Sequence, residues 1–312
     1  MKNIKYLLLA VMLTSAIAWR PLHLAVVARK RTAVFRVTFL SGVTPANIVL
    51  HADYTGPANP AAALYDAGDG VWTAYTSNTI AIAGNYVAFR GDWRNAAGGY
   101  NSMFRDTFKS AAYTCAFSGA LKETPSAFAS CYRRIFNGCT AVVRIEDNPL
   151  PILTGSPAAY MFRETCDGMS GVTALPAGFM DTSGLTGSPA EAMFYYACNG
   201  MSGVTNSLPA GFMDTSGLTG SPAEGMLKYA CNGMSSLSGG NMYVGTNITM
   251  TTTNLSTLDW LDYTMSGCSS WTGQMYYGAA VIHTVITPTN DLNTFENCVN
   301  MPDYGTINAN WK

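Results

Sequence analysis

Two aspartates in this sequence occur in matching tetrapeptides and could support hydrolysis by acid–base catalysis. Asp181-Thr-Ser-Gly184 and Asp214-Thr-Ser-Gly217 lie 33 residues apart. Catalysis by a carboxylate pair requires a shared proton, so the two carboxyl groups must meet at about 3 Å. Copies in successive repeats are instead expected to lie side by side as surface turns, because Asp and Ser hydrogen-bond to the local backbone there. We therefore interpret both aspartates as turn residues.

Eight cysteines could provide thiol or disulfide chemistry. Six of them follow an apolar residue by three or four positions and precede another by three. Free cysteine is among the most buried residue types and packs as a small hydrophobe, so this pattern predicts free, buried thiols in the core of a repeat. The six are Cys139, Cys166, Cys198, Cys231, Cys268 and Cys298. Cys115 and Cys131 fall outside the pattern and are the candidates for a disulfide bridge.

No other spacing predicts a catalytic, metal or cofactor site. His23, His51 and His283 are far apart, and no His-x-x-x-His, paired Cys-x-x-Cys or glycine-rich phosphate loop occurs. A Ser–His–Asp triad stays open, because its members are neighbours in space and not in sequence. We expect no metal, no cofactor and no enzymatic activity.

Arg90-Gly91-Asp92 is an integrin-type tripeptide and the candidate site for binding a partner. Phe89 and Trp93 flank it, and the residues before it read as a strand. These neighbours favour a packed glycine turn. A binding role requires that the loop be exposed.

Composition and charge exclude several classes of protein. Charged residues make up 12% of the 312 residues, and the formal net charge is −1. Such a chain lacks the clustered Lys and Arg of a nucleic-acid binder, and no apolar run reaches the roughly 18 residues of a membrane span. Residues 19–150 carry 13 basic and 8 acidic groups, whereas 151–312 carry 3 and 11. This shift indicates a change of architecture near the middle of the chain.

The N-terminal segment is typical of an export signal. Lys2 and Lys5 precede a short apolar stretch, and Ala16-Ile17-Ala18 supplies the small residues that a signal peptidase accepts. We expect residues 1–18 to be removed and the protein to be secreted or held at the cell surface.

The second half of the chain consists of repeats. Residues 153–184 and 185–217 agree at 25 of 32 positions when one inserted residue is allowed, and a third copy covers 218–240. The cysteine pattern extends this to about six units. A period of 32–33 residues is typical of stacked supersecondary units.

One unit reads as a short helix followed by a short strand. Ser188 resembles an N-cap with Glu191 at the third position, residues 192–198 carry an apolar face, and Gly200 would end the helix. Residues 204–208 read as a strand. A unit of this kind buries its apolar face only against its copies. The sequence therefore predicts an α+β repeat solenoid.

The repeats also carry a resemblance. IFNGCTAV (135–142), FYYACNGMSGV (194–204) and TFENCVNM (294–301) resemble the Phe-x-x-Cys-x-x-Leu core of the bacterial BspA-like leucine-rich repeat surface proteins. The resemblance covers roughly residues 111–312. It implies a leucine-rich-repeat-like solenoid, export to the surface or medium, and a role in adhesion or protein binding.

A different segment precedes the repeats. Short strands are predicted at 32–39, 47–51, 71–76, 80–83 and 86–90, and Phe35, Val37 and Phe39 alternate onto one face of the first. We expect a small β-rich domain that caps the first repeat. The expected division is a signal peptide at 1–18, this capping domain at 19–110 and the solenoid at 111–312.

These observations predict an exported, non-catalytic protein that binds a protein or glycan partner at a surface. One alternative is a structural component of a surface layer or fibre, in which repeats stack between chains. The polar C-terminal residues 308–312 favour a monomer over that alternative. The second alternative is an enzyme with an unrecognised site, which a strongly perturbed acid or histidine in a cleft would indicate.

Overall fold

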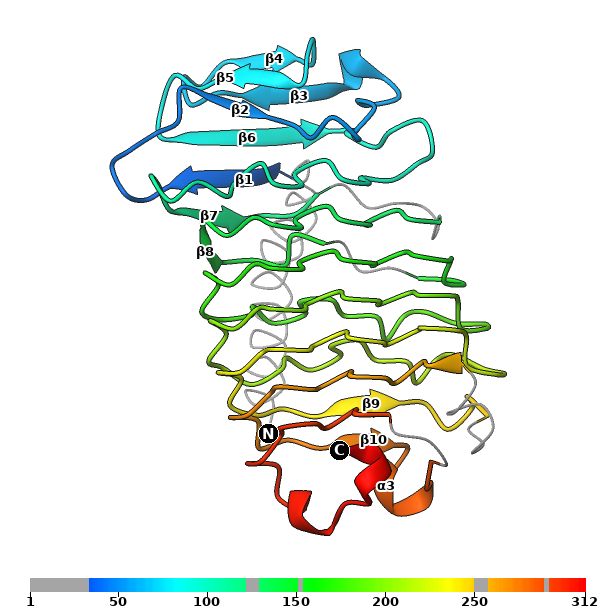
Figure 1. Ribbon diagram of the computed structural model, residues 1–312. Helices are drawn as coiled ribbons and strands as arrows, with labels where there is room; N and C mark the ends of the chain where they lie inside the picture. The colour runs from blue at the N-terminus through cyan, green and yellow to red at the C-terminus, as the bar shows by residue number, and fades with distance from the viewer. Residues whose placement is uncertain (1–33, 122–128, 151–153, 250–257, 289–291) are drawn as a thin grey trace, which may run out of the picture.

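The computed structural model describes residues 34–121, 129–150, 154–249, 258–288 and 292–312. The signal peptide predicted at 1–18 lies outside these described residues. In the part described, three sheets lie toward the two ends of the molecule, and rows of chain without regular strands lie side by side between them (Figure 1).

The largest sheet has six strands. Their order is β4 (Trp72–Ala74), β3 (Ala63–Asp66), β6 (Tyr86–Gly91), β1 (Val34–Phe39), β7 (Cys115–Ser118) and β8 (Val142–Ile145). β1 pairs antiparallel with both β6 and β7, and β7 pairs in parallel with β8. The sheet therefore runs across the boundary expected at residue 110 and joins the N-terminal segment to the first repeats.

The N-terminal strands follow the predicted alternation. Phe35 and Val37 are fully buried and Phe39 is 4% exposed, so one face of β1 lies in the core. The five predicted strands are confirmed with bounds that differ by up to two residues at either end. The two not yet described are β2 (Asn47–Val49) and β5 (Thr79–Ala81), which pair with each other. The sequence does not predict β3, because its buried residues are the first and last of the strand and do not alternate.

The remaining regular elements are short. A three-stranded sheet has the order β11 (Ala280–Val281), β10 (Met275–Tyr277) and β9 (Met242–Val244). The α-helix α3 (Ile282–Val285) follows β11 directly, and three 3-10 turns complete the elements: η1 (Pro60–Ala62), η2 (Tyr304–Thr306) and η3 (Ala309–Trp311).

Seven segments of consecutive turns, here called turn rows, build the body of the molecule. A residue with positive φ recurs at every fourth position of a row, as at Tyr160 (59°), Glu164 (55°) and Gly168 (75°). The left-handed conformation costs a residue other than glycine about 1–2 kcal/mol, so the rows need compensating interactions. The turn rows are residues 100–106, 130–138, 160–168, 192–200, 225–233, 259–267 and 293–297.

Hydrogen bonds between neighbouring turn rows supply that compensation. Alternate N–H groups of one row donate to carbonyl groups of the next, as Phe162 does to Met193 (2.8 Å) and Cys166 to Ala197 (2.8 Å). The intervening N–H groups close turns within their own row. Across the described rows, these bonds run from the N–H of the earlier row to the C=O of the later one. After the last row, Phe295 N–H donates to the carbonyl of Trp311 (2.9 Å).

The prediction of an α+β repeat solenoid of the leucine-rich-repeat type is wrong. Among the described residues the α-helix is α3, outside the clear repeats, and the strands belong to three sheets. Residues 192–198 form turns instead of a helix, because Ala192 and Tyr196 adopt φ values of 47° and 56° and their N–H groups bond to the next row. Residues 204–208 form no strand.

Glycines set the register of the turn rows. Gly138, Gly168, Gly200, Gly233 and Gly267 form a column in which successive backbones approach closely: a Cβ added to Gly200 would lie 3.7 Å from Gly168 Cα. This register divides the six repeat cysteines into two columns. Cys166, Cys198 and Cys231 lie two positions before the glycine of their row. Cys139, Cys268 and Cys298 lie one position after the place of that glycine.

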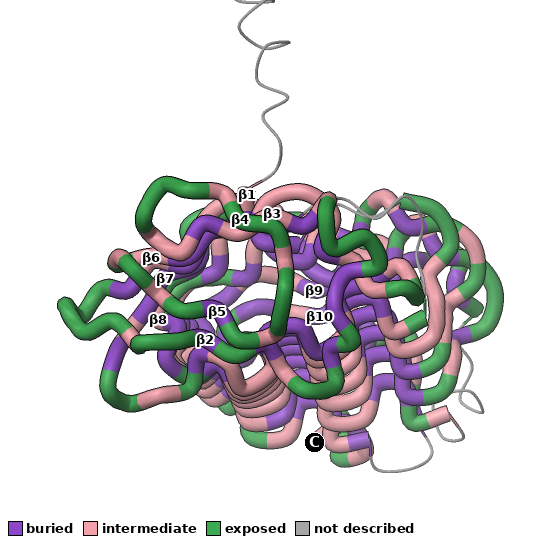
Figure 2. The backbone as a smooth tube through the Cα atoms, turned by 90° about the horizontal axis from the view of Figure 1, so that it is seen from above, coloured by how far each residue is buried: buried purple, intermediate pink, exposed green. Residues whose placement is uncertain are grey.

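One hydrophobic core continues from the N-terminal sheet to the C-terminal residues, from Phe35 to Trp311. Seen from above, buried chain lines the interior of the body, and exposed chain lies at its corners and loops (Figure 2). Tyr132, Phe162 and Phe194 stack in successive rows of this core, with ring centroids 5.5 and 5.3 Å apart. The rows therefore act as a rigid frame for the side chains on the outer surface.

Candidate functional site

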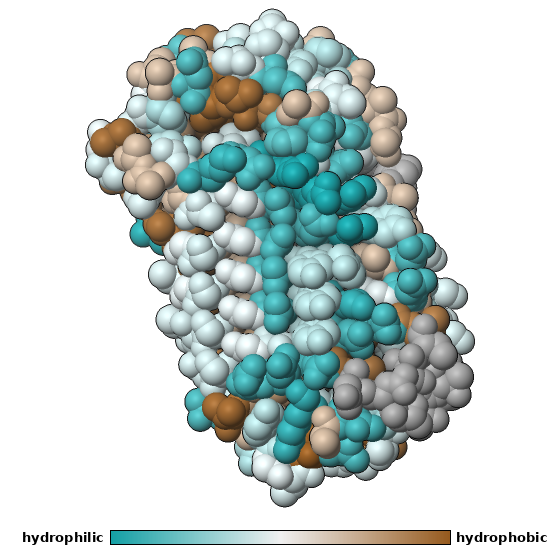
Figure 3. Space-filling view, in the orientation of Figure 1, coloured by the Kyte–Doolittle hydropathy of each residue, from teal (hydrophilic) through white to brown (hydrophobic). Residues whose placement is uncertain are grey.

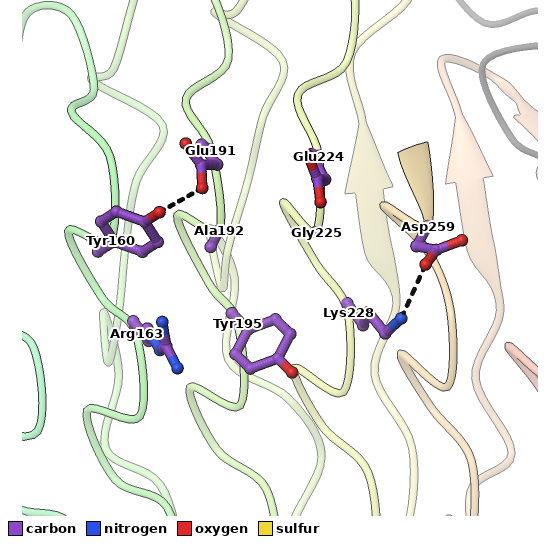
Figure 4. Close-up of a pocket in the computed structure, with 9 residues that line it drawn as sticks. All are labelled: Tyr160, Arg163, Glu191, Ala192, Tyr195, Glu224, Gly225, Lys228 and Asp259. Atoms are coloured by element: carbon purple, nitrogen blue, oxygen red, sulfur yellow. Dashed lines mark hydrogen bonds and ion pairs between the residues drawn. The ribbon is translucent and has the colours of Figure 1, made fainter. Parts of the chain in front are cut away.

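A trough crosses four successive turn rows and has a volume of about 250 Å³. Hydrophilic side chains run along much of the long face seen in Figure 3, and hydrophobic ones gather mainly toward its two ends. The lining of the trough is itself mostly polar (Figure 4). It consists of Tyr160, Arg163, Glu191, Ala192, Tyr195, Glu224, Gly225, Lys228 and Asp259.

The floor of the trough exists because two rows carry small residues at one position. Tyr160, Ala192, Gly225 and Asp259 are equivalent residues with φ between 47° and 60°. Ala192 and Gly225 leave space above the backbone, whereas Tyr160 and Asp259 stand at the two ends (Figure 4). At about 4.8 Å per row, the distance between those ends is about 14 Å.

The two long sides differ in chemistry. Glu191 and Glu224 lie along one side, and Arg163, Tyr195 and Lys228 lie along the other (Figure 4). Tyr160 donates a hydrogen bond from its hydroxyl to Glu191. The Arg163 guanidinium lies 5.0 Å from the centre of the Tyr195 ring.

Both cations beside the trough are already paired. Lys228 Nζ lies 3.0 Å from Asp259 Oδ2 and 3.4 Å from Asp262 Oδ2. Burial alone would lower the pKa of Lys228, but its hydrogen bond to Asp259 and the charge of Asp262 raise it. Arg163 Nε donates to Glu164 Oε1 at 2.9 Å. Within the part of the chain described, no hydrogen bond or ion pair engages the Glu224 carboxylate, although the backbone carbonyl of Glu224 accepts from Ala192 N–H (2.8 Å).

Two columns of side chains stiffen the face next to the trough. Tyr196, Tyr229 and Tyr263 stack with centroids 4.5 and 4.8 Å apart and nearly parallel rings. Burial raises the pKa of Tyr196 to about 12. Beside this stack, Asp167 accepts hydrogen bonds from Asn137 Nδ2 (2.9 Å) and Asn199 Nδ2 (2.7 Å). Each column ties neighbouring rows together, so the trough is preformed.

The two nearly identical repeats differ mainly at this face. Six of the seven substitutions between 153–184 and 185–217 fall within 159–167 and its equivalent 191–199. They place Glu191, Ala192 and Tyr195 where the preceding copy has Ala159, Tyr160 and Arg163. Exposure alone does not explain the difference, since most exposed positions elsewhere are identical in both copies, Ala174 being the exception. The unchanged exposed positions include Ser183 and Ser216, Thr186 and Thr154, and Ser188 and Ser156.

Sequence reasoning missed the trough, although a signal for it was present. The agreement between the repeats reveals the repeat period, whereas the positions at which they disagree mark the site. Without the register of the rows, however, nothing in the sequence shows that residues 160, 192, 225 and 259 are equivalent and lie in adjacent rows.

The structure places Arg90, Gly91 and Asp92 at the end of β6, away from the trough. The Arg90 guanidinium lies 4.1 Å from the centre of the Trp72 ring, and Asp92, whose side chain is 25% exposed, forms an ion pair with Arg94. A Cβ added to Gly91 would meet the carbonyl oxygen of Ala62 at 2.0 Å. The tripeptide therefore occupies a packed turn.

We expect Asp92→Glu to lower the free energy of unfolding by about 1 kcal/mol, because the longer side chain loses the geometry of its bond to Arg94. Attachment to integrin-bearing cells, measured per folded molecule, should not change. Thermal denaturation and a cell-attachment assay measure the two quantities. A selective loss of attachment at unchanged stability would show that the tripeptide is a recognition site.

All eight cysteines are buried and none of them forms a disulfide, so the bridge considered for Cys115 and Cys131 is not present. Burial raises the pKa of Cys139 and of Cys298 to about 12, and it raises the pKa of Cys198 well above its usual value. The Cys139 thiol donates to the carbonyl of Phe104 at 2.9 Å. Only the thiolate is nucleophilic, so these groups act as core side chains.

We therefore expect the native protein to resist a disulfide-exchange thiol reagent at pH 8, and the unfolded, unreduced protein to release eight equivalents. The high pKa values and the burial both suppress the thiolate in the folded state. Counting thiols with and without denaturant provides the measurement. Fewer than six titratable thiols in the unfolded protein would contradict this interpretation.

The predicted turn role of Asp181 and Asp214 agrees with their contacts. Asp181 Oδ1 accepts from the backbone N–H of Ser183 (3.0 Å), and Asp214 Oδ1 accepts from that of Ser216 (2.7 Å). Among the described residues, no group of three or more His, Cys, Asp or Glu side chains is arranged to hold a metal ion. The same residues contain no helix that is long and apolar enough to cross a membrane.

No family model, no curated protein and no solved structure matches this chain. The resemblance to BspA-like surface proteins therefore stays a prediction from the sequence.

Proposed function

We propose that this chain is an exported, non-catalytic binding protein that holds a protein or glycan partner against the face of its turn rows, at the trough. One observation carries the proposal: the two nearly identical repeats differ chiefly at the residues that line or border the trough. Most core positions and most other exposed positions stay the same; the exceptions are Thr165, which is Ala197 in the next copy, and Ala174, which is replaced there by Asn206 and Ser207. Side chains that differ from row to row give each row its own contacts with a partner.

The rigidity of the face supports the same function. Cross-row hydrogen bonds and the tyrosine and asparagine columns fix the trough before a partner arrives. A preformed surface binds with little loss of conformational entropy. Arg163 and Lys228 already form ion pairs with neighbouring carboxylates. This favours recognition over catalysis, because neither charge is left available to act on a substrate.

The test uses Ala192→Tyr, which gives the second row the residue that Tyr160 places in the row before it. The fold accepts tyrosine there, since Tyr160 has a φ of 59° and Ala192 one of 47°. Thr186→Tyr is the matched control, with the same ring at an exposed position in the same repeat. Both variants and the parent are tested against purified matrix proteins and a glycan panel.

We expect Ala192→Tyr to weaken binding at least tenfold and Thr186→Tyr to leave it unchanged. Equal effects of the two variants, or no binding to any member of the panel, would count against the proposal. Export is tested separately by N-terminal sequencing of protein recovered from the culture medium, which should begin at Trp19.

A further inference from the structure

Three carboxylates line the trough, those of Glu191, Glu224 and Asp259, against the two cations Arg163 and Lys228. Lys228 is paired with Asp259 and Asp262, and Arg163 shares the carboxylate of Glu164 with Arg134. Glu191, by contrast, accepts a hydrogen bond from the neutral hydroxyl of Tyr160. Glu224 is exposed, and its carboxylate has no hydrogen-bond or ion-pair partner among the described residues. In the described part of the chain, these two carboxylates therefore face the space above the floor without an ion pair.

The shape of the trough limits what those carboxylates can bind. Glu191 and Glu224 occupy equivalent positions in adjacent rows, so their backbones are about 4.8 Å apart. Ala192 and Gly225 form the floor beside them, and the Tyr195 ring lies across from them (Figure 4). Tyr160 and Asp259 close the two ends. The space suits one long side chain with an apolar stem and a charged head more than a polymer running through it.

We infer that the trough binds the side chain of a lysine or arginine presented by a protein partner. Glu191 and Glu224 form charge-assisted hydrogen bonds with the ammonium or guanidinium group. The methylene stem lies on Ala192 and against Tyr195, as basic side chains commonly lie along apolar surface while the charged head stays in water. This inference rests on the proposed function and specifies the ligand chemistry of the same site.

The first experiment uses small probes with the full-length protein: the Nα-acetyl methylamides of lysine and arginine, with the Nε-acetylated lysine derivative as the neutral control. We expect the two charged probes to bind with a Kd of about 1 mM, as befits such small ligands. Binding should weaken on raising NaCl from about 50 to about 500 mM, because salt screens exposed charges. Chemical-shift changes in NMR spectra give the affinities.

Variants locate the binding. Glu224→Gln removes one charge with little change in shape and should weaken binding of the lysine probe about threefold to tenfold. Glu146→Gln is the matched control, because Glu146 is an exposed acid outside the trough, 2.8 Å from Arg144, and its loss should have no effect. Ala192→Tyr should abolish binding.

Three outcomes would overturn the inference: equal binding of the Nε-acetylated probe, no effect of Glu224→Gln, or tighter binding of chitosan oligomers, which would assign the site to amino sugars. These outcomes differ from failure of the proposed function. If the basic probes do not bind but Ala192→Tyr still abolishes binding to the panel, the lysine inference is wrong and the binding role stands. If Ala192→Tyr has no effect on any ligand, both are wrong.

Discussion

Deletion of residues 185–217 is expected to leave a soluble, cooperatively folded protein with one turn row fewer. The cut joins Gly184 to Leu218 and recreates the natural junction between Gly217 and Leu218. Row 160–168 would then donate to row 225–233. Cys166, which now donates to Ala197, would donate to Ala230, as Cys198 already does at 2.8 Å. The loss should equal the contribution of one row, because each row contacts its nearest neighbours.

A deletion of 200–224 serves as the out-of-phase control. It removes Gly200 from the end of one row and joins the remainder directly to the start of another, so donors and acceptors no longer match. We expect this variant to be insoluble. Circular dichroism during heating reports cooperativity, and small-angle scattering should show the in-phase variant to be shorter by about 4.8 Å. An insoluble in-phase variant would show that the rows are not interchangeable.

Gly203→Ala is expected to destabilise the protein by about 3 kcal/mol, the size typical of forcing an atom into a filled interior. A Cβ at residue 203 would lie 2.4 Å from the carbonyl oxygen of Ser170 and 2.8 Å from that of Val172. Both contacts are with backbone of the neighbouring repeat, so no side chain can rotate away. Gly171 has the same arrangement one repeat earlier, with the carbonyl oxygen of Thr140 at 2.7 Å.

Gly305→Ala provides the comparison, because nothing lies within 4 Å of its added Cβ. We expect its unfolding free energy to stay within about 0.5 kcal/mol of the parent value. Denaturant titration of both variants measures the difference. Similar stabilities for Gly203→Ala and Gly305→Ala would mean that adjacent repeats are not packed as closely as the structure shows.

The sequence predicts the repeats and the N-terminal strands but not the conformation within a repeat. Alternation at Phe35, Val37 and Phe39 is a local signal, and β1 forms as expected. Ser188 and Glu191 are equally good local signals for a helix start, yet the chain forms turns. The hydrogen bonds that decide the matter join residues about 30 positions apart, and local propensity carries no information about them.

The cysteine pattern also shows that local sequence signals do not reveal which residues become neighbours in adjacent rows. Intervals of 27 between Cys139 and Cys166 and of 37 between Cys231 and Cys268 depart from the 30–33 of the others. These departures mark the points where cysteine moves from one core column to the other, which requires the glycine register to recognise. The trough is a similar case, because its lining depends on which residues become equivalent in adjacent rows.

The single direction of the cross-row hydrogen bonds gives the molecule an electrical polarity. Each aligned peptide unit carries a dipole of about 3.5 D, and the cross-row N–H groups of the turn rows point toward the C-terminal end, which makes that end of the rows positive. Some bonds between repeats outside the rows run the opposite way, as from Thr186 N–H to the carbonyl of Gly155 and from Thr219 N–H to that of Gly187. Residues 151–312 carry 11 acidic groups against 3 basic ones, so the acidic half of the chain lies at the positive pole. The same compensation places acidic side chains at the N-termini of α-helices. The uneven charge of the sequence thus has a backbone counterpart in the turn rows.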